Sequence, residues 1–186
     1  SKNSIGVAGG KMSNLAEIKN HLKIPTPEGF VITSYAYVKF IDYNNLSEKI
    51  SDILSLLNIE KLENIEECSK KIKMLIYNSK IPPELEDSIM KSYNRLCKKI
   101  GYNCKVAIRS SAIREDTDFS FAGQYTTFLN TPGELIIKRY KEVVSSLFNT
   151  RAIFYYKTKG FSENEMVMSV GVLSMINAKS GGVMYT

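Results

Sequence analysis

Hydrophobic and polar positions divide the chain into three zones with different periods. In residues 1–43, hydrophobic residues recur three and four positions apart after two glycines, which predicts a helix that ends before Pro25. The strand-like segment GFVIT and another helix follow it. Residues 44–104 keep the helical period, which predicts three amphipathic helices. The last of these begins at Pro82-Pro83-Glu84 and ends at Gly101, as is typical of helix termini.

Residues 105–186 change to the alternation of strands. The segments KVAIRSS, TTFLN, MVMSVGVLSMI and GGVMYT are predicted strands, and 132–160 is a long helical stretch with a possible break near Asn149. Together the zones predict an α+β protein with a helical insertion. Because the sequence stops inside strand-like sequence, we expect it to be a truncated piece of a longer chain.

Composition is that of an ordinary globular protein, with 186 residues, 44% of them hydrophobic and 24% charged. No apolar run is long enough for a membrane span, and the N-terminus lacks the apolar core of a signal peptide. We therefore expect a cytoplasmic protein without a membrane partner. The net charge of +6 is compatible with a nucleic-acid partner, with a phosphorylated small molecule, or simply with solubility. The lysines are scattered, which favours a solvated surface.

Metal and nucleophile chemistry find little support. The cysteines are odd in number and too widely separated for a zinc spacing, so we expect free, mostly buried thiols. His21 is the only histidine and falls on a lysine-rich helix face, which indicates a surface residue. A Ser-His-Asp or Cys-His system is therefore excluded, and no metal cluster is visible.

Three segments carry groups that suit phosphate. Gly9-Gly10-Lys11 precedes a helix, although Ile5 and Met12 stand where a Walker loop needs glycine and Ser or Thr. Arg109 lies in an apolar strand, where it either pairs with Glu115 or Asp116 or grips an anion. Arg151 either anchors its helix or reaches a phosphate.

Taken in order, GGKMSNLAEIKNHLKIPTPEGFVIT, VAIRSSAIREDTDFSFAGQYTTFLN, SLFNTRAIFYYKTKG and MVMSVGVLSMINAKSGGVMYT resemble the N-terminal nucleotide-binding region of the phosphoenolpyruvate synthase (pyruvate, water dikinase) family. The resemblance implies an ATP-grasp-like nucleotide-binding fold, of which this chain holds the N-terminal part. Residues 1–43 and 105–186 would form its N-terminal lobe, truncated at the C-terminus, and 44–104 a helical subdomain. ATP and Mg²⁺ are the implied ligands.

In this family the lysine of GGK and the arginine of the RSSA motif contact the ATP phosphates, and a loop ending in AGQ closes over them. An adenine site is implied near the end of the last strand. The nucleotide-binding residues implied by the resemblance are Lys11, Arg109, Ser111, Gly123, Gln124, Thr127, Arg151, Met175 and Ile176.

The resemblance implies a phosphotransferase that passes the β-phosphoryl of ATP to a histidine on a separate domain and then to pyruvate. His21 does not match that histidine, and the magnesium ligands are expected beyond residue 186, so we expect no catalytic residue here and an inactive fragment. Leu173 and Tyr156 depart from the family pattern. A rifampicin phosphotransferase-type kinase fragment shares these motifs. A basic, non-enzymatic RNA- or protein-binding module is the alternative of a different class, but we expect no nucleic-acid partner. Oligomeric state stays open.

Overall fold

The computed structural model describes residues 2–101, 104–112, 126–160 and 166–182 of the chain. Gly123, Gln124, Glu115 and Asp116, for which the sequence made predictions, lie outside these ranges. In chain order, the described elements are α1 (Lys2–Asn20), β1 (Gly29–Ile32), α2 (Ser34–Tyr43), α3 (Leu46–Ser55), α4 (Leu62–Asn78), α5 (Pro83–Ile100), β2 (Val106–Ala112), β3 (Thr127–Thr131), the 3₁₀ turn η1 (Gly133–Leu135), α6 (Ile136–Ser145), the 3₁₀ turn η2 (Ser146–Phe148), α7 (Thr150–Thr158) and β4 (Met168–Ser174).

The described strands form one antiparallel sheet in the order β1-β4-β2-β3. The last strand in sequence therefore lies between the first and the second. Arg109 of β2 is opposite Gly171 of β4 on one side and Thr127 of β3 on the other. Since side chains alternate between the two faces of a strand, this register decides which residues share a face.

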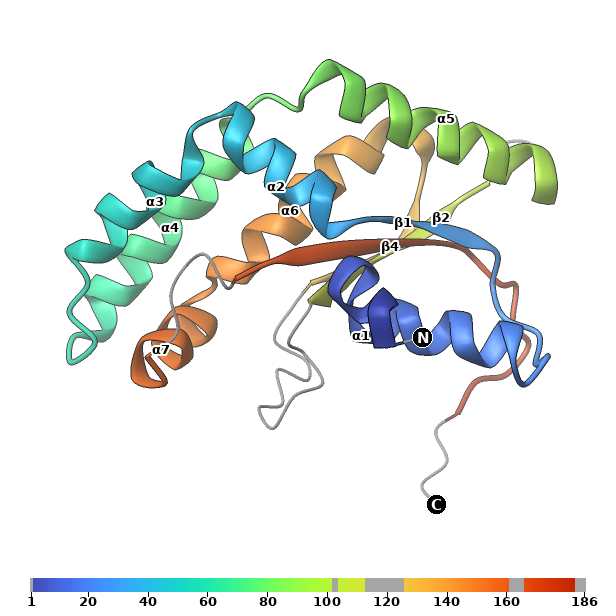
Figure 1. Ribbon diagram of the computed structural model, residues 1–186, viewed down its shortest axis with the longest axis horizontal. Coiled ribbons are helices and arrows are strands. Elements are labelled where there is room, and N and C mark those ends of the chain that lie inside the picture. Colours follow the sequence, from blue (N-terminus) through green and yellow to red (C-terminus); the bar gives the residue numbers. More distant parts are fainter. Residues whose placement is uncertain (1, 102–103, 113–125, 161–165, 183–186) are drawn as a thin grey trace.

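Helices cover the two faces of the sheet unequally. The helix α1 lies against one face, where it contacts β1, β2 and β4 (Figure 1). On the other side, α6 contacts β2, β3 and β4, α2 contacts β4, and α5 contacts β1. Figure 1 shows α5 and α2 above the sheet and α1 below it. The thicker helical layer lies on the side that buries the core.

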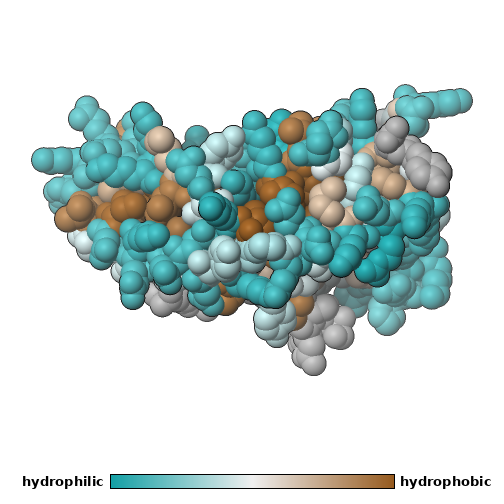
Figure 2. Space-filling view, turned by 90° about the horizontal axis from the view of Figure 1, so that it is seen from above, coloured by the Kyte–Doolittle hydropathy of each residue, from teal (hydrophilic) through white to brown (hydrophobic). Residues whose placement is uncertain are grey.

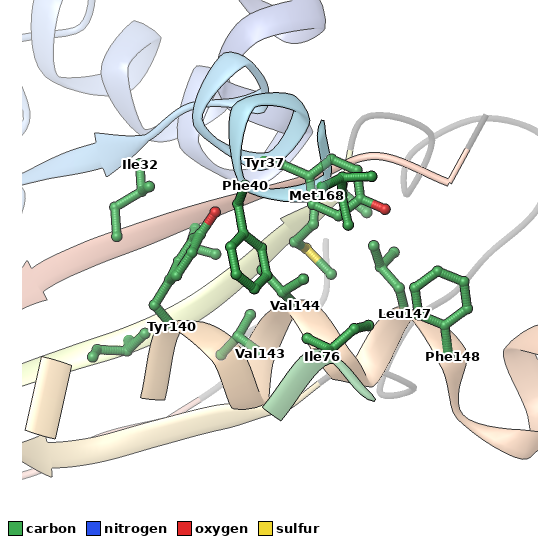
Figure 3. Close-up of a cluster of buried hydrophobic side chains, with 14 of the residues drawn as sticks. Ile32, Tyr37, Phe40, Ile76, Tyr140, Val143, Val144, Leu147, Phe148 and Met168 are labelled. Carbon is green, nitrogen blue, oxygen red and sulfur yellow. The ribbon is translucent and has the colours of Figure 1, made fainter. Parts of the chain in front are cut away.

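The hydrophobic core fills the space between the sheet and helices α2, α4 and α6. Phe40, Ile76, Tyr140 and Val144 are fully buried there, and Figure 3 shows them converging from α2, α4 and α6. The rings of Phe40 and Tyr140 meet edge to face, with centroids 6.2 Å apart. Because α4 belongs to the middle zone of the sequence and α6 to the last, one core joins the zones.

Helix boundaries follow local chemistry. Pro83 is the first residue of α5, acidic residues occupy its first turn and lysines its last, and Gly101 ends it with a φ of 119°. The helix α7 begins after Asn149, whose side-chain oxygen accepts a hydrogen bond from the N–H of Ala152 at 2.8 Å. These three termini agree with the sequence prediction, including the break near Asn149.

The predicted α+β class is confirmed, and GFVIT, KVAIRSS, TTFLN and MVMSVGVLSMI all contain the expected strands. The predicted strand GGVMYT is only partly described. Gly181 and Gly182 are not in a strand, and 183–186 lie outside the described residues. The first helix also differs from its prediction, because it begins before the glycines and is broken at Gly9.

The surface seen from above is largely hydrophilic, with hydrophobic groups emerging near its middle and toward the end where α3 and α4 lie (Figure 2). Leu56 and Leu62, at the ends of these two helices, are among the exposed large hydrophobic residues. No helix in the described ranges is both long enough and apolar enough to cross a membrane.

Candidate functional site

A glycine break in α1 creates a second helix start in the middle of that element. Gly9 has φ 72° and ψ 166°, which no helical residue adopts, and helical geometry resumes after it. Backbone N–H groups in the first turn of a helix have no partner within the helix. One of them, the N–H of Met12, donates a hydrogen bond of 3.3 Å to Ser111 Oγ on β2. The turn at Gly9-Gly10-Lys11 is therefore attached to the sheet.

Only glycine fits this contact. A Cβ added to Gly9 would lie 2.1 Å from the carbonyl oxygen of Ser111 and 2.5 Å from its Oγ. A second bond ties the preceding turn of α1 to the sheet, where Ser169 Oγ donates to the carbonyl oxygen of Val7 at 2.9 Å. Ser169 is opposite Ser111 in the β2–β4 pairing. The two serines thus hold the kinked part of α1 against one face.

Arg109 is the one exposed residue of β2, a strand otherwise buried along its described length. It is two positions from Ser111, so both side chains lie on the face that carries α1. No ion pair or side-chain hydrogen bond joins Arg109 to another described residue. Among the described residues, β2 thus places one exposed guanidinium on this face.

Lys11 and Thr127 border the same face. Lys11 is exposed and directly precedes Met12, whose side chain packs on Gly171 so closely that a Cβ there would lie 2.3 Å from Met12 Sδ. Gly171 is the β4 partner of Arg109, and Thr127 is its β3 partner. The structure therefore brings Lys11, Arg109, Ser111 and Thr127 to one side of the sheet.

The other candidate residues lie elsewhere. Arg151 is exposed on α7 and lines a hollow with Ile59, Leu62 and Phe154. Figure 1 shows α7 well apart from α1. Met175 follows β4, and its N–H donates to the carbonyl oxygen of Lys105 at 3.1 Å, while Ile176 is exposed. At about 3.4 Å per strand residue, Met175 is roughly 13 Å along β4 from the level of Arg109.

Some residues of this face were not singled out from the sequence. Met12, Ser169 and Gly171 shape it by packing or hydrogen bonding with α1. A signal was present in the segment MVMSVGVLS, where small residues stand at alternate positions of an otherwise bulky strand. Small residues at every second position of a strand indicate that another backbone approaches that face closely.

Other predictions from the sequence can be compared with the described residues. His21 is exposed, as expected. Within the described ranges, no three His, Cys, Asp or Glu side chains gather in a way that could hold a metal ion. The RNA-binding alternative needs exposed aromatic side chains on which bases can stack. The tyrosines of the middle zone are Tyr77, Tyr93 and Tyr102. Tyr93 is buried and Tyr102 lies outside the described residues, which leaves Tyr77.

The chain is similar along its whole length to a family model and to several proteins. The model described as "Pyruvate phosphate dikinase, AMP/ATP-binding domain" matches residues 5–186. A probable phosphoenolpyruvate synthase of Staphylothermus marinus is 40% identical over 190 residues, covering 100% of this chain and 23% of that protein. The phosphoenolpyruvate synthase of Aquifex aeolicus is 40% identical over 190 residues, with coverages of 98% and 22%.

The phosphoenolpyruvate synthase of Escherichia coli is 34% identical over 191 residues, covering 99% of this chain and 24% of that protein. The chain thus spans about a quarter of the length of the curated relatives it matches.

Proposed function

Since the chain belongs to the pyruvate phosphate dikinase AMP/ATP-binding domain family, we propose that it is the ATP-binding part of a phosphoenolpyruvate synthase-like phosphotransferase. Within this proposal the fold is ATP-grasp-like, with 1–43 and 105–186 as its N-terminal lobe and 44–104 as a helical subdomain. The supporting similarity extends over both parts of the lobe and the helical zone between them.

The observation that carries the proposal is the placement of Arg109. A strand that is buried at its neighbouring positions presents this one cation, and it does so on the face where α1 restarts after Gly9. A guanidinium gripping a phosphate forms paired, charge-assisted hydrogen bonds, and a helix start favours negative charge. Two anion-binding devices on one sheet face support a polyphosphate ligand.

Each residue has a role in this proposal. Arg109 grips phosphate oxygens, and Lys11 adds a second positive charge beside the helix start. Ser111 is fully buried under α1 and its Oγ accepts the N–H of Met12, so in this proposal it positions the helix start beside the phosphates. Thr127 offers a hydroxyl from β3. Together they orient ATP and neutralise its charge, which is the main task of a protein in phosphoryl transfer.

The other nucleotide-binding residues that the family resemblance implies keep their proposed roles. Gly123 and Gln124 would close over the phosphates, Met175 and Ile176 would border the adenine, and Arg151 would reach the nucleotide only from α7. Mg²⁺ finds no suitable set of three ligands among the described residues. As the family resemblance implies, this proposal places the Mg²⁺ ligands beyond residue 186 and assigns the ion no step here.

For the whole protein we propose transfer of the β-phosphoryl group of ATP to a histidine on a separate domain and then to pyruvate. The chain in hand supplies binding and orientation for the first step. In this proposal the acceptor histidine and the pyruvate site lie on later domains, for which the relatives, about four times longer than the matched region, have room.

The test is calorimetric titration of the full-length protein with MgATP and with AMP. Replacing Arg109 by alanine removes a charge-assisted hydrogen-bonding pair worth about 1.5–3 kcal/mol, so ATP affinity should fall about 10- to 100-fold. Lys11→Ala should also lower the affinity for MgATP. Both losses should be smaller for AMP, which lacks the β- and γ-phosphates.

The matched control is Arg95→Ala. Arg95 is exposed on α5, a helix that contacts β1 and lies across the sheet from α1 (Figure 1). Its removal changes the net charge by the same amount without touching the proposed site. If Lys11→Ala and Arg109→Ala both bind MgATP as tightly as Arg95→Ala does, the assignment of this face is refuted.

A further inference from the structure

Two cysteines meet where α5 ends and β2 begins. Cys97 lies in the last turn of α5, and Cys104 lies two residues before β2, seven positions later in the sequence. Their Sγ atoms are 2.7 Å apart, well inside an ordinary nonbonded contact between sulfurs, although both are free thiols. The side chains therefore already point at each other, as a disulfide requires.

The surroundings hold this arrangement in place. Cys97 is buried, whereas Cys104 is half-buried and so within reach of a small reagent. Tyr93, one turn before Cys97 on α5, donates its hydroxyl to the carbonyl oxygen of Cys104 at 2.9 Å. This bond fixes the backbone of Cys104 against α5. Formation of a disulfide would then need little movement of either chain segment.

The two thiols differ in acidity. Burial alone raises the pKa of Cys97, but hydrogen bonding, chiefly with Cys104, outweighs it and leaves that pKa below its ordinary value. For Cys104, burial and then the hydrogen bond with Cys97 raise the pKa to about 11. Of the two thiols, Cys97 therefore loses its proton first. A thiolate is the form that attacks a disulfide sulfur.

We propose that Cys97 and Cys104 form a redox-active dithiol, which a low-molecular-weight disulfide converts to an intramolecular disulfide. The proposal is independent of nucleotide binding, because it rests on the two sulfurs and their neighbours alone. It places a reversible covalent link between α5 and the strand that carries Arg109 and Ser111.

The exchange is balanced in two steps. With a reagent RSSR, Cys104 passes its proton to the adjacent Cys97 sulfur and attacks one sulfur of RSSR as a thiolate; the displaced RS⁻ takes that proton from Cys97 and leaves as RSH. The Cys97 thiolate then attacks the Cys104 sulfur, and the second RS⁻ leaves and takes a proton from solvent. Two protein thiols are oxidised to one disulfide, and RSSR is reduced to two RSH. A small dithiol reductant reverses both steps.

The link would restrain the connection between α5 and β2. Gly101, with its positive φ, lies in the segment that it closes, and the carbonyl oxygen of Lys105 directly after Cys104 accepts the N–H of Met175. A disulfide over so short a segment removes a modest amount of freedom from the unfolded chain. We expect the melting temperature Tm of the domain to rise by about 5 °C on oxidation.

The experiment incubates the full-length protein with graded ratios of oxidised to reduced glutathione, followed by alkylation and peptide mass spectrometry. The wild type should yield the Cys97–Cys104 linked peptides, two hydrogen masses lighter than the thiol pair, with little glutathione attached. In Cys97→Ser the resolving thiolate is gone, so Cys104 should accumulate the glutathione mixed disulfide. The matched control Cys68→Ser should form the link as the wild type does, because Cys68 lies on α4.

Two results would overturn the proposal. One is glutathione accumulating on Cys104 of the wild type to the same extent as in Cys97→Ser, with no linked peptides. The other is a wild type that forms the linked peptides but whose Tm on oxidation rises no more than that of Cys97→Ser. Because the mapping reads the sulfurs directly, it also reports on a variant of lowered stability, and Cys104→Ser provides a second, independent loss of the link.

Discussion

The contact between Gly9 and Ser111 predicts a large difference between two glycine substitutions in the same helix. Gly9→Ala places a methyl group 2.1 Å from the Ser111 carbonyl oxygen, a backbone atom of a buried strand that cannot move aside. The torsions of Gly9, φ 72° and ψ 166°, add strain for any L-residue. Strain of about 1–3 kcal/mol and overpacking of about 1–3 kcal/mol together predict a loss of roughly 2–6 kcal/mol in unfolding free energy.

Gly6 is the matched control. It belongs to the same helix, has no atom within 4 Å of an added Cβ, and does not have a positive φ. Gly6→Ala should therefore stabilise the helix by up to about 1 kcal/mol, because alanine is the better helix former. Gly171→Ala is intermediate, since its Cβ would meet the flexible end of Met12 rather than backbone.

The assay is urea unfolding of each variant, followed by titration of the folded protein with MgATP. The order of stability should be Gly6→Ala, then Gly171→Ala, then Gly9→Ala. ATP affinity should fall most in Gly9→Ala, because pushing the turn away from Ser111 moves Lys11 and the helix start. A Gly9→Ala variant within about 0.5 kcal/mol of Gly6→Ala would refute the close approach of the turn to β2.

Two further predictions concern single side chains. Tyr140 is fully buried, its hydroxyl has no hydrogen-bond partner among the described residues, and burial raises its pKa. Tyr140→Phe should therefore raise the unfolding free energy by about 1 kcal/mol. Tyr93→Phe should lower it, because the variant loses a hydrogen bond to a carbonyl oxygen. Equal effects of the two substitutions in urea unfolding would contradict this. Hydrogen bonds from Lys19 and then Lys99 hold the pKa of Glu28 below its ordinary value of 4.5. A carboxyl group whose pKa is lower in the folded state stabilises the fold above its unfolded-state pKa, and this stabilisation is lost as the pH falls through its folded-state pKa. The loss of unfolding free energy in Glu28→Gln should therefore become smaller in acid. A loss that does not change with pH would contradict the pairing.

Much of the fold was predictable because the signals were local. Proline at the start of α5, glycine after its end and asparagine before α7 mark termini through the torsions and hydrogen bonds of a few adjacent residues. The alternation in VAIRSSA predicted a buried strand, and the exposed Arg109 follows from the cost of burying an unpaired charge. The break of α1 was not predicted, because Gly9 adopts its torsions in response to β2.

The candidate site was predictable in its residue types and only partly in its arrangement. Lys11, Arg109, Ser111 and Thr127 share a face because β2 pairs with β3 and β4 in one register. Arg151, singled out by the same reasoning, lies on α7 with the α3–α4 connection instead. The meeting of Cys97 and Cys104 was also missed, since their spacing fits no metal motif and their contact depends on how the end of α5 lies beside the residues before β2.

By itself, the sequence determined the helices, most of the strands and the presence of phosphate-compatible groups, because period, capping and side-chain chemistry act over a few residues. Only the tertiary structure decided which of those groups share one face of the sheet. That choice depends on the order β1-β4-β2-β3 and on the seat of α1 against Ser111 and Ser169. The contacts of α1 with Ser111 and Ser169 join residues 99 and 162 positions apart, and the sheet places the last strand between the first and the second. A one-residue change of register would turn Arg109 to the core face.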